Sequence, residues 1–86
     1  MYTIEVKRSA QKELSAIPEN FREKIISAID ALADNPRPDG VKKLKLSQNL
    51  WRIRVGDYRI IYTIEDSLQI LEVQKIGHRK DIYRSL

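Results

Sequence analysis

Hydrophobic and polar residues alternate on both sides of Gly56 and Asp57, and this pattern predicts a β-hairpin over residues 50–64. A glycine at the first central position suits a two-residue type II′ turn, whose twist matches that of paired strands. A turn of this length sets the register, so that Val55 faces Tyr58. It also predicts three further pairs, which are Arg54–Arg59, Ile53–Ile60 and Trp51–Tyr62.

The two faces of this hairpin differ in chemistry because successive side chains of a strand point to opposite sides. One face carries apolar residues suited to burial, namely Trp51, Ile53, Val55, Tyr58, Ile60 and Tyr62. The other face carries Arg52, Arg54 and Arg59, with Ile61 and Thr63 beside them. Like charges that face each other across a sheet are destabilising by roughly 0.2–1 kcal/mol per pair. Three arginines without a carboxylate therefore predict an anion site, and phosphate fits the planar guanidinium best. A basic face that contacts only solvent is the alternative.

The N-terminal half of the chain shows one alternating run and two stretches with helical spacing. Residues 2–7 alternate and predict a half-buried strand. Ser9 is expected to cap a helix that runs to about residue 17, where Pro18 ends it. A second helix is predicted over residues 19–34, with one apolar stripe. The side chains expected to point inward from these three elements are Tyr2, Ile4, Val6, Ala10, Leu14, Ile17, Phe21, Ile25, Ala28, Ile29 and Leu32.

Two further strands are expected on either side of the hairpin. After a turn at residues 35–40, residues 42–46 predict a short strand whose Lys43 and Lys45 lie on one face, opposite two leucines. Residues 68–76 have apolar side chains on both faces, as is typical of a central strand, and Gly77 is expected to end it. The element order β-α-α-β-β-β-β predicts an α+β fold in one domain over residues 1–86. Two N-terminal helices would pack on one face of a small, mainly antiparallel sheet, leaving the arginine face open.

Charge and composition limit the classes of partner that the chain is expected to bind. The net charge is +4, and residues 37–86 hold eleven Lys and Arg against six Asp and Glu. This concentration of positive charge favours a polyanion partner, nucleic acid first and an acidic protein second. There is no cysteine and one histidine, so no metal site is predicted. The absence of a long apolar run and of a signal peptide predicts a cytoplasmic protein with no membrane partner.

The missing residue types limit the possible chemistry. A metal-dependent nuclease needs clustered carboxylates, and the hairpin offers only Asp57 in its turn and Glu65 and Asp66 at its far end. A Ser–His–Asp hydrolase would need a nucleophile motif that the chain lacks. Metal-free and cofactor-free cleavage of a phosphodiester remains. RNA suits this route because its 2′-hydroxyl supplies the nucleophile.

The chain contains two motifs, WRIRVGDYRIIY and GHRKDIYR. On these motifs and on the element order, the chain resembles the RelE/ParE toxin superfamily, and its RelE branch most. The resemblance covers nearly the whole chain. It implies a RelE-like fold and the activity of an mRNA interferase, a ribosome-dependent endoribonuclease that cleaves mRNA in the ribosomal A site and stops translation. It also implies three partners, a cognate antitoxin (expected to be acidic), the ribosome and mRNA.

The family's site residues fall on Arg52, Arg54, Arg59, Arg79 and Tyr83. Well-known members carry lysine at the first two of these positions, and one of those lysines is proposed as the general base. Because arginine does not readily give up its proton, Arg52 and Arg54 are expected to hold the phosphate and stabilise the transition state.

The proton-transfer groups must then come from other residues. His78 is the natural candidate for base or acid because it titrates near neutral pH. The alternative is that His78 is an ordinary turn residue without a catalytic role. Tyr83 could stack on a base, orient the nucleophile or exchange a proton, and Lys45 is a third candidate. Lys43, Lys45 and Arg84 are expected to contact the substrate. The alternatives are that Lys43, together with Lys42, forms a basic patch facing solvent or ribosomal RNA, and that Arg84 makes no contact.

Two other functions fit the same sequence. One is inhibition of DNA gyrase, as in ParE-like members of the superfamily. The other is a non-catalytic nucleic-acid-binding module, which would bind RNA in a salt-dependent manner without cleaving it.

Overall fold

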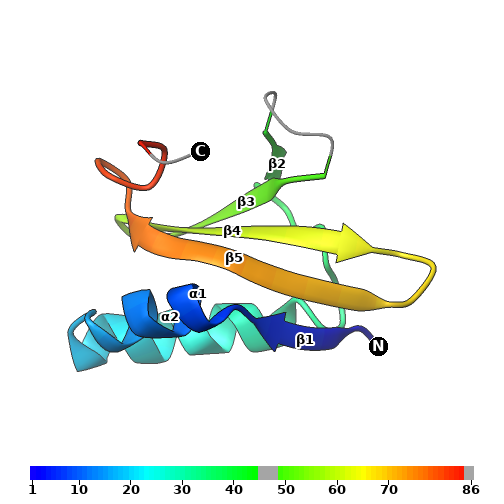
Figure 1. The fold of residues 1–86 in the computed structure, drawn as a ribbon, viewed down its shortest axis with the longest axis horizontal. Helices are drawn as coiled ribbons and strands as arrows, with labels where there is room; N and C mark the ends of the chain where they lie inside the picture. Colours follow the sequence, from blue (N-terminus) through cyan, green and yellow to red (C-terminus); the bar gives the residue numbers. More distant parts are fainter. Residues whose placement is uncertain (45–48, 85–86) are drawn as a thin grey trace.

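The computed structural model describes residues 1–44 and 49–84 of the chain. Its elements are β1 (Thr3–Val6), α1 (Arg8–Ser15), α2 (Glu19–Ala31), β2 (Lys42–Lys43), β3 (Trp51–Val55), β4 (Tyr58–Glu65) and β5 (Ile70–His78). The strands form one sheet in the order β1-β5-β4-β3-β2, in which β1 is parallel to β5 and the other neighbours are antiparallel. Both helices lie against one face of this sheet (Figure 1), which confirms the predicted α+β architecture.

The core lies between the two helices and the apolar face of the sheet. The largest fully buried side chains on this side include Tyr62, Ile25, Leu32 and Ile60. Phe21 was predicted to point inward with the other apolar residues of the N-terminal half, but it is 41% exposed. Its ring lies 5.6 Å from that of Tyr58, at the margin of the core.

The hairpin of β3 and β4 has the predicted register at every pair. Gly56 has φ +59°, while Asp57 does not have a positive φ, which is the pattern of a type II′ turn. The six residues predicted for the buried face all belong to the helix-side core or pack against it. The two-residue turn therefore determines which side chains face away from the helices.

Several predicted boundaries were wrong. α1 begins at Arg8, so that Lys7 is the N-cap and Ser9 lies inside the first turn without capping it. α2 ends at Ala31 and not at residue 34. β2 has only two residues, and Lys45 lies outside the described residues.

β5 also departs from the predicted pattern. The strand continues through Gly77 to His78 and so does not end before them. A β-bulge interrupts its pairing with β4, because Ile61 pairs with Lys75 while Tyr62 pairs with Val73. The bulge adds one residue to β5 and reverses the alternation of its side chains from there onward. Beyond the end of β1, the Glu13 carboxylate of α1 accepts a hydrogen bond from the Ile76 amide at 3.1 Å.

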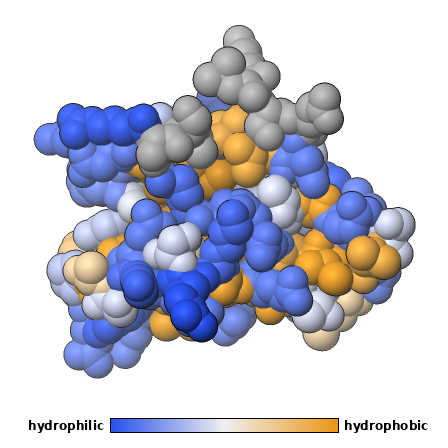
Figure 2. Space-filling view, viewed as in Figure 1, coloured by the Kyte–Doolittle hydropathy of each residue, from blue (hydrophilic) through white to orange (hydrophobic). Residues whose placement is uncertain are grey.

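The face of the sheet opposite the helices is not fully open, which corrects the sequence-based prediction. The chain turns back after β5 and lies over this outer face (Figure 1). Ile82 is 2% exposed and Ile61 is fully buried, although neither belongs to the helix-side core. Figure 2 shows an apolar area on this side of the molecule, with hydrophilic side chains below it.

A polar cluster joins the N-terminus, the loop after α2 and the β4–β5 turn. Arg37 donates two hydrogen bonds to Asp66, at 2.9 and 3.2 Å, and the Tyr2 hydroxyl donates a third. These donors lower the pKa of Asp66, and the same contact with Asp66 raises the pKa of Tyr2. The Arg37 guanidinium also lies 4.7 Å above the ring of Trp51. Within the described part of the chain, no helix is long and apolar enough to cross a membrane.

A candidate phosphate-binding basin on the outer face

A hollow of about 550 Å³ lies on the outer face between β2, β3, β4 and the C-terminal segment. We call it the basic basin. It is lined by Lys42, Lys43, Leu44, Arg52, Arg54, Arg59, Arg79, Lys80 and Tyr83. Seven of these nine side chains are cations and none is a carboxylate. Cations gathered in one hollow create a positive potential that attracts polyanions.

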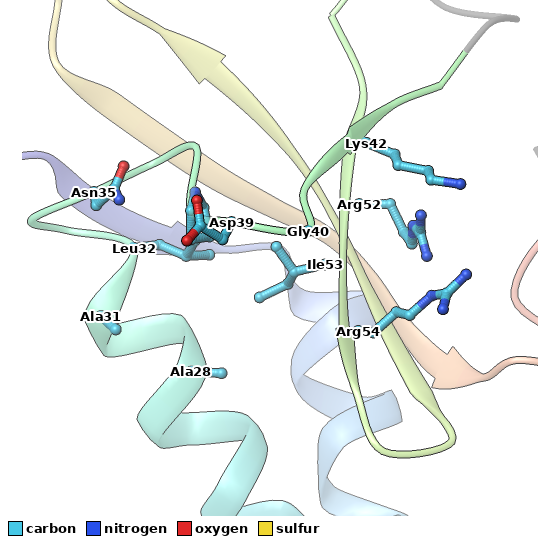
Figure 3. A pocket seen from close by; sticks show the side chains of 11 residues that line it. Ala28, Ala31, Leu32, Asn35, Asp39, Gly40, Lys42, Arg52, Ile53 and Arg54 are labelled. Atoms are coloured by element: carbon cyan, nitrogen blue, oxygen red, sulfur yellow. The ribbon is translucent and has the colours of Figure 1, made fainter.

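The strand register brings the arginines of the basin together. Arg54 of β3 pairs with Arg59 of β4, and Lys42 of β2 pairs with Arg52 of β3. Directly paired residues share a face of the sheet. Figure 3 shows Lys42, Arg52 and Arg54 projecting to the same side, away from α2, while Ile53 points toward α2.

Arg52 lies at the floor of the basin and is the residue with the least usual environment. It is 4% exposed and is the only charged residue among the buried residues of the described chain. Its Nε atom is buried without a hydrogen-bond partner among the residues that the structure describes. An unpaired buried charge is costly to a fold. A cation held in this way is suited to an anionic partner, which the described residues do not supply.

The other arginines of the basin are anchored to different degrees. Arg59 donates from Nη1 to the carbonyl oxygens of Gly56 and Tyr58, both at 3.0 Å, which fixes its direction without neutralising it. Arg79 is tied to the hairpin turn: its amide donates to the Asp57 carbonyl at 2.8 Å, and its Nε lies 3.6 Å from the Asp57 carboxylate. Of the four predicted arginines, Arg79 alone has a carboxylate partner among the described residues.

The segment after β5 closes one side of the basin. Its first two residues, Arg79 and Lys80, and then Tyr83, line the hollow, and Tyr83 is 45% exposed. Arg84, predicted to contact substrate, does not line it; its Nη1 lies 3.6 Å from the Asp81 carboxylate in an exposed pair.

His78, predicted to be the acid or base at this site, lies on the other face of the sheet. It pairs with Tyr58, and its ring contacts the Tyr58 ring edge-on at 5.8 Å on the side of the core. Its Nδ1 accepts a hydrogen bond from the Lys80 amide at 3.2 Å. The bulge in β5 causes this placement, because simple alternation from Val73 would have put His78 beside the arginines.

Sequence reasoning also missed two residues of the basin. Lys42 was not selected, although its pairing with Arg52 places it on the arginine face, whereas Lys43 pairs with Trp51. The Lys43 ammonium lies 5.6 Å from the centroid of the Trp51 ring, although Lys43 also lines the basin. Lys80 was missed because no pattern in the sequence predicted the turn that carries it.

A second hollow of about 600 Å³ lies around the edge of β3, beside α2. It shares Lys42, Arg52 and Arg54 with the basin and is otherwise lined mainly by α2 and the loop that follows it (Figure 3). Among the described residues, no group of three or more His, Cys, Asp or Glu side chains is placed to hold a metal ion.

Comparisons with known proteins identify the family of the chain. The family model "ParE toxin of type II toxin-antitoxin system, parDE" matches residues 4–83. The putative toxin RelE1 of Methanocaldococcus jannaschii is 28% identical over 98% of this chain and 97% of its own length. Toxin RelE3 of the same organism is 34% identical, with 84% of each chain covered.

Solved structures show the same fold. A chain of the archaeal RelE–RelB complex from Pyrococcus horikoshii superposes with a TM-score of 0.82 at 26% identity, over 93% of this chain and 97% of that one. The isolated E. coli RelE toxin gives a TM-score of 0.79 at 21% identity, covering 91% and 84% of the two chains. The chain therefore belongs to the ParE/RelE family of toxins of type II toxin–antitoxin systems, with RelE toxins among its relatives.

Proposed function

We propose that this chain is a ribosome-dependent endoribonuclease that cleaves mRNA in the ribosomal A site, with the basic basin as its active site. The observation that carries the proposal is Arg52, a nearly buried arginine that lines the same hollow as three other arginines and has no carboxylate partner among the described residues. Such a group is maintained at a cost to stability, as is common at sites that stabilise charge in a transition state.

The proposed reaction uses the 2′-hydroxyl of the substrate. Its oxygen attacks the adjacent phosphorus and the bond to the 5′-oxygen breaks, which leaves a 2′,3′-cyclic phosphate and a 5′-hydroxyl. One proton leaves the 2′-hydroxyl and one reaches the departing 5′-oxygen. Arg52, Arg54 and Arg59 bind the phosphate oxygens as negative charge grows on them. DNA lacks the 2′-hydroxyl and would not be cleaved by this route.

Proton transfer falls to groups in the basin other than the arginines. Besides the arginines, the side chains of the basin that carry exchangeable protons are Tyr83 and the lysines Lys42, Lys43 and Lys80. We assign Tyr83 to orienting the 2′-hydroxyl and donating a proton to the departing 5′-oxygen, because it is partly exposed at the open side of the basin. The proton of the 2′-hydroxyl passes to solvent water, which also returns a proton to Tyr83. His78 is not part of the proposal, since it lies on the core side of the sheet.

The partner proposed for regulation is an acidic antitoxin. The similar solved structures from P. horikoshii and M. jannaschii are RelE–RelB complexes. An acidic segment laid over the basin would neutralise its cations and exclude RNA. Loss of this inhibition at high salt would be the expected signature.

The direct test is cleavage of mRNA on programmed ribosomes, read by primer extension. The wild-type chain is expected to cut within the A-site codon, and Arg54→Ala and Arg59→Ala are each expected to slow cleavage by about 100-fold or more. Arg84→Ala is the matched control, because it removes an arginine that lies outside the basin and should leave the rate unchanged. Equal rates for all four proteins, or no cleavage by the wild type, would reject the proposal.

A second candidate is inhibition of DNA gyrase, which is favoured by the match to a ParE family model. Inhibition of supercoiling at protein concentrations that do not cleave ribosome-bound mRNA would establish this function instead.

A further inference from the structure

The outer face of the sheet has a small apolar contact of its own. Ile82 is 2% exposed and lies against β5 at Gly77, where a Cβ atom would come within 3.2 Å of the Ile82 Cδ1. Gly77 pairs with Arg59, so this contact is directly beside the basin. A glycine at this position lets the isoleucine approach the strand closely.

This contact attaches the segment after β5, residues 79–84, to the sheet. Arg79 is bound to the hairpin turn through Asp57. The subsequent hydrogen bonds among described residues stay within the turn itself: the amides of Asp81 and Ile82 donate to the His78 carbonyl at 2.9 and 3.0 Å, and the Arg84 amide donates to the Asp81 carbonyl. Between Lys80 and Arg84, Ile82 is therefore the described side chain that is buried against the sheet.

Two residues of the basin depend on this anchor. Lys80 and Tyr83 are exposed, and they lie two residues before and one residue after Ile82. Their side chains can face Arg52 and Arg54 only while the turn stays on the outer face. An error of about 1 Å in the placement of a catalytic group can cost about 100-fold in rate.

We propose that Ile82, seated on Gly77, is a positioning residue that holds Lys80 and Tyr83 at the basin. Its effect on catalysis rests on the proposed function, whereas its effect on the geometry of the turn does not. Ile82 itself touches no substrate. It acts through the placement of Tyr83, so its loss lowers kcat much more than it raises KM, because the arginines of β3 and β4 still bind the phosphate.

The first experiment compares two identical deletions on opposite faces of the sheet. Ile82→Ala is expected to lower kcat for ribosome-bound mRNA by about 100-fold per folded molecule. Ile64→Ala is the matched control, because Ile64 is 4% exposed in the helix-side core and pairs with Leu71, far from the basin. The control should keep the kcat of the wild type once the folded fraction is measured by circular dichroism. Parallel losses in both variants would overturn the proposal.

A size exchange provides the second test and uses milder changes. Gly77→Ala introduces a Cβ that crowds the Ile82 Cδ1, and Ile82→Val removes that same atom. The Gly77→Ala single variant should lower kcat, and the Gly77→Ala/Ile82→Val double variant should recover most of the loss. Equal kcat values for the Gly77→Ala single and the double variant would contradict the proposed contact, even if Ile82→Ala fails to fold.

An NMR measurement separates this inference from the proposed function. In Ile82→Ala the Tyr83 ring signals should shift toward those of a free tyrosine, and the Arg84 amide should exchange faster with solvent, while Ile64→Ala leaves both unchanged. This result would support the anchor even if the wild type cleaves no mRNA, an outcome that would reject only the proposed function. Unchanged Tyr83 signals in Ile82→Ala would overturn the inference.

Discussion

Replacing Arg52 with methionine is expected to make the protein more stable and less able to bind anions. Arg52 is 4% exposed, and its Nε has no partner among the described residues. Methionine keeps an unbranched, flexible side chain and so preserves much of the packing of the arginine stem. It removes the buried polar group and the positive charge that faces Lys42 and Arg54.

The size of the effect follows from the cost of that buried group. An unsatisfied buried donor costs about 1–3 kcal/mol, so Arg52→Met should raise the free energy of unfolding by about this amount. For a domain of this length, the corresponding rise in Tm is about 4–8 °C per kcal/mol. A bound anion has the opposite effect on this comparison, because it stabilises the wild type more than the variant. Phosphate at 100 times its Kd would stabilise the wild type by about 2.7 kcal/mol, and the variant would lose most of this gain.

Urea unfolding followed by tryptophan fluorescence, with and without phosphate, measures both effects. Without phosphate the midpoint of Arg52→Met should exceed that of the wild type with an unchanged m-value. With phosphate the difference should shrink or reverse. Arg84→Met is the control, since Arg84 is exposed and should change stability by less than about 0.5 kcal/mol. A variant that unfolds at lower urea than both the wild type and this control would refute the reasoning, because it would mean that the Arg52 guanidinium is satisfied in the folded protein.

Three further predictions concern the scaffold. Arg37, followed by Tyr2, lowers the pKa of Asp66 below its ordinary 3.8, so Asp66 contributes stability above that pH, and the contribution is lost as the pH falls through the folded pKa. The urea midpoint of Asp66→Asn should consequently change less than that of the wild type below about pH 4, and equal slopes would contradict this. Gly56→Ala should cost about 1–3 kcal/mol in thermal unfolding, because Gly56 has φ +59°; an unchanged Tm would argue against the type II′ turn. Tyr62→Phe removes a hydroxyl that donates to the Pro36 carbonyl at 2.6 Å and should cost roughly 1–2 kcal/mol. Burial raises the pKa of Tyr62 to about 12, so spectrophotometric titration should show one tyrosine ionising last in the wild type and no such group in the variant.

The hairpin could be read from the sequence because a two-residue turn and strict alternation leave one register. Each pair from Val55–Tyr58 to Trp51–Tyr62 follows from Gly56 and a period of two. The same rule placed Arg52, Arg54 and Arg59 on one face, and the structure brings them together in the basin. Local patterns were sufficient wherever the pairing is uninterrupted.

His78 could not be placed in this way because a bulge depends on packing between strands. The apolar residues of β5 that face the core are Leu71, Val73 and Ile76, with spacings of two and then three. That change of spacing is the only sign of the bulge in the sequence. Counting through it without a break puts His78 among the arginines, whereas the strand turns it toward Tyr58.

Local sequence patterns also could not predict that the outer face of the sheet is partly covered. Ile82 belongs to a segment of turns with no periodic pattern, and its burial depends on the absence of a side chain at Gly77. Arg52 was expected on an open face, but the strands and segments around it leave it 4% exposed. Burial of this kind results from tertiary contacts between elements that are distant in the sequence.

The central claim is that Arg52 and its neighbouring arginines form a preorganised site for an RNA phosphate. The most direct measurement is NMR of the Arg52 Nε–Hε group during titration with a short RNA whose 2′-hydroxyls are replaced by hydrogen, so that it binds without being cleaved. We predict that the Arg52 signal is visible because the group is buried, that it shifts in a saturable manner, and that Arg54→Ala weakens the binding while Arg84→Ala does not. Saturable binding that leaves the Arg52 signal unmoved would contradict the account.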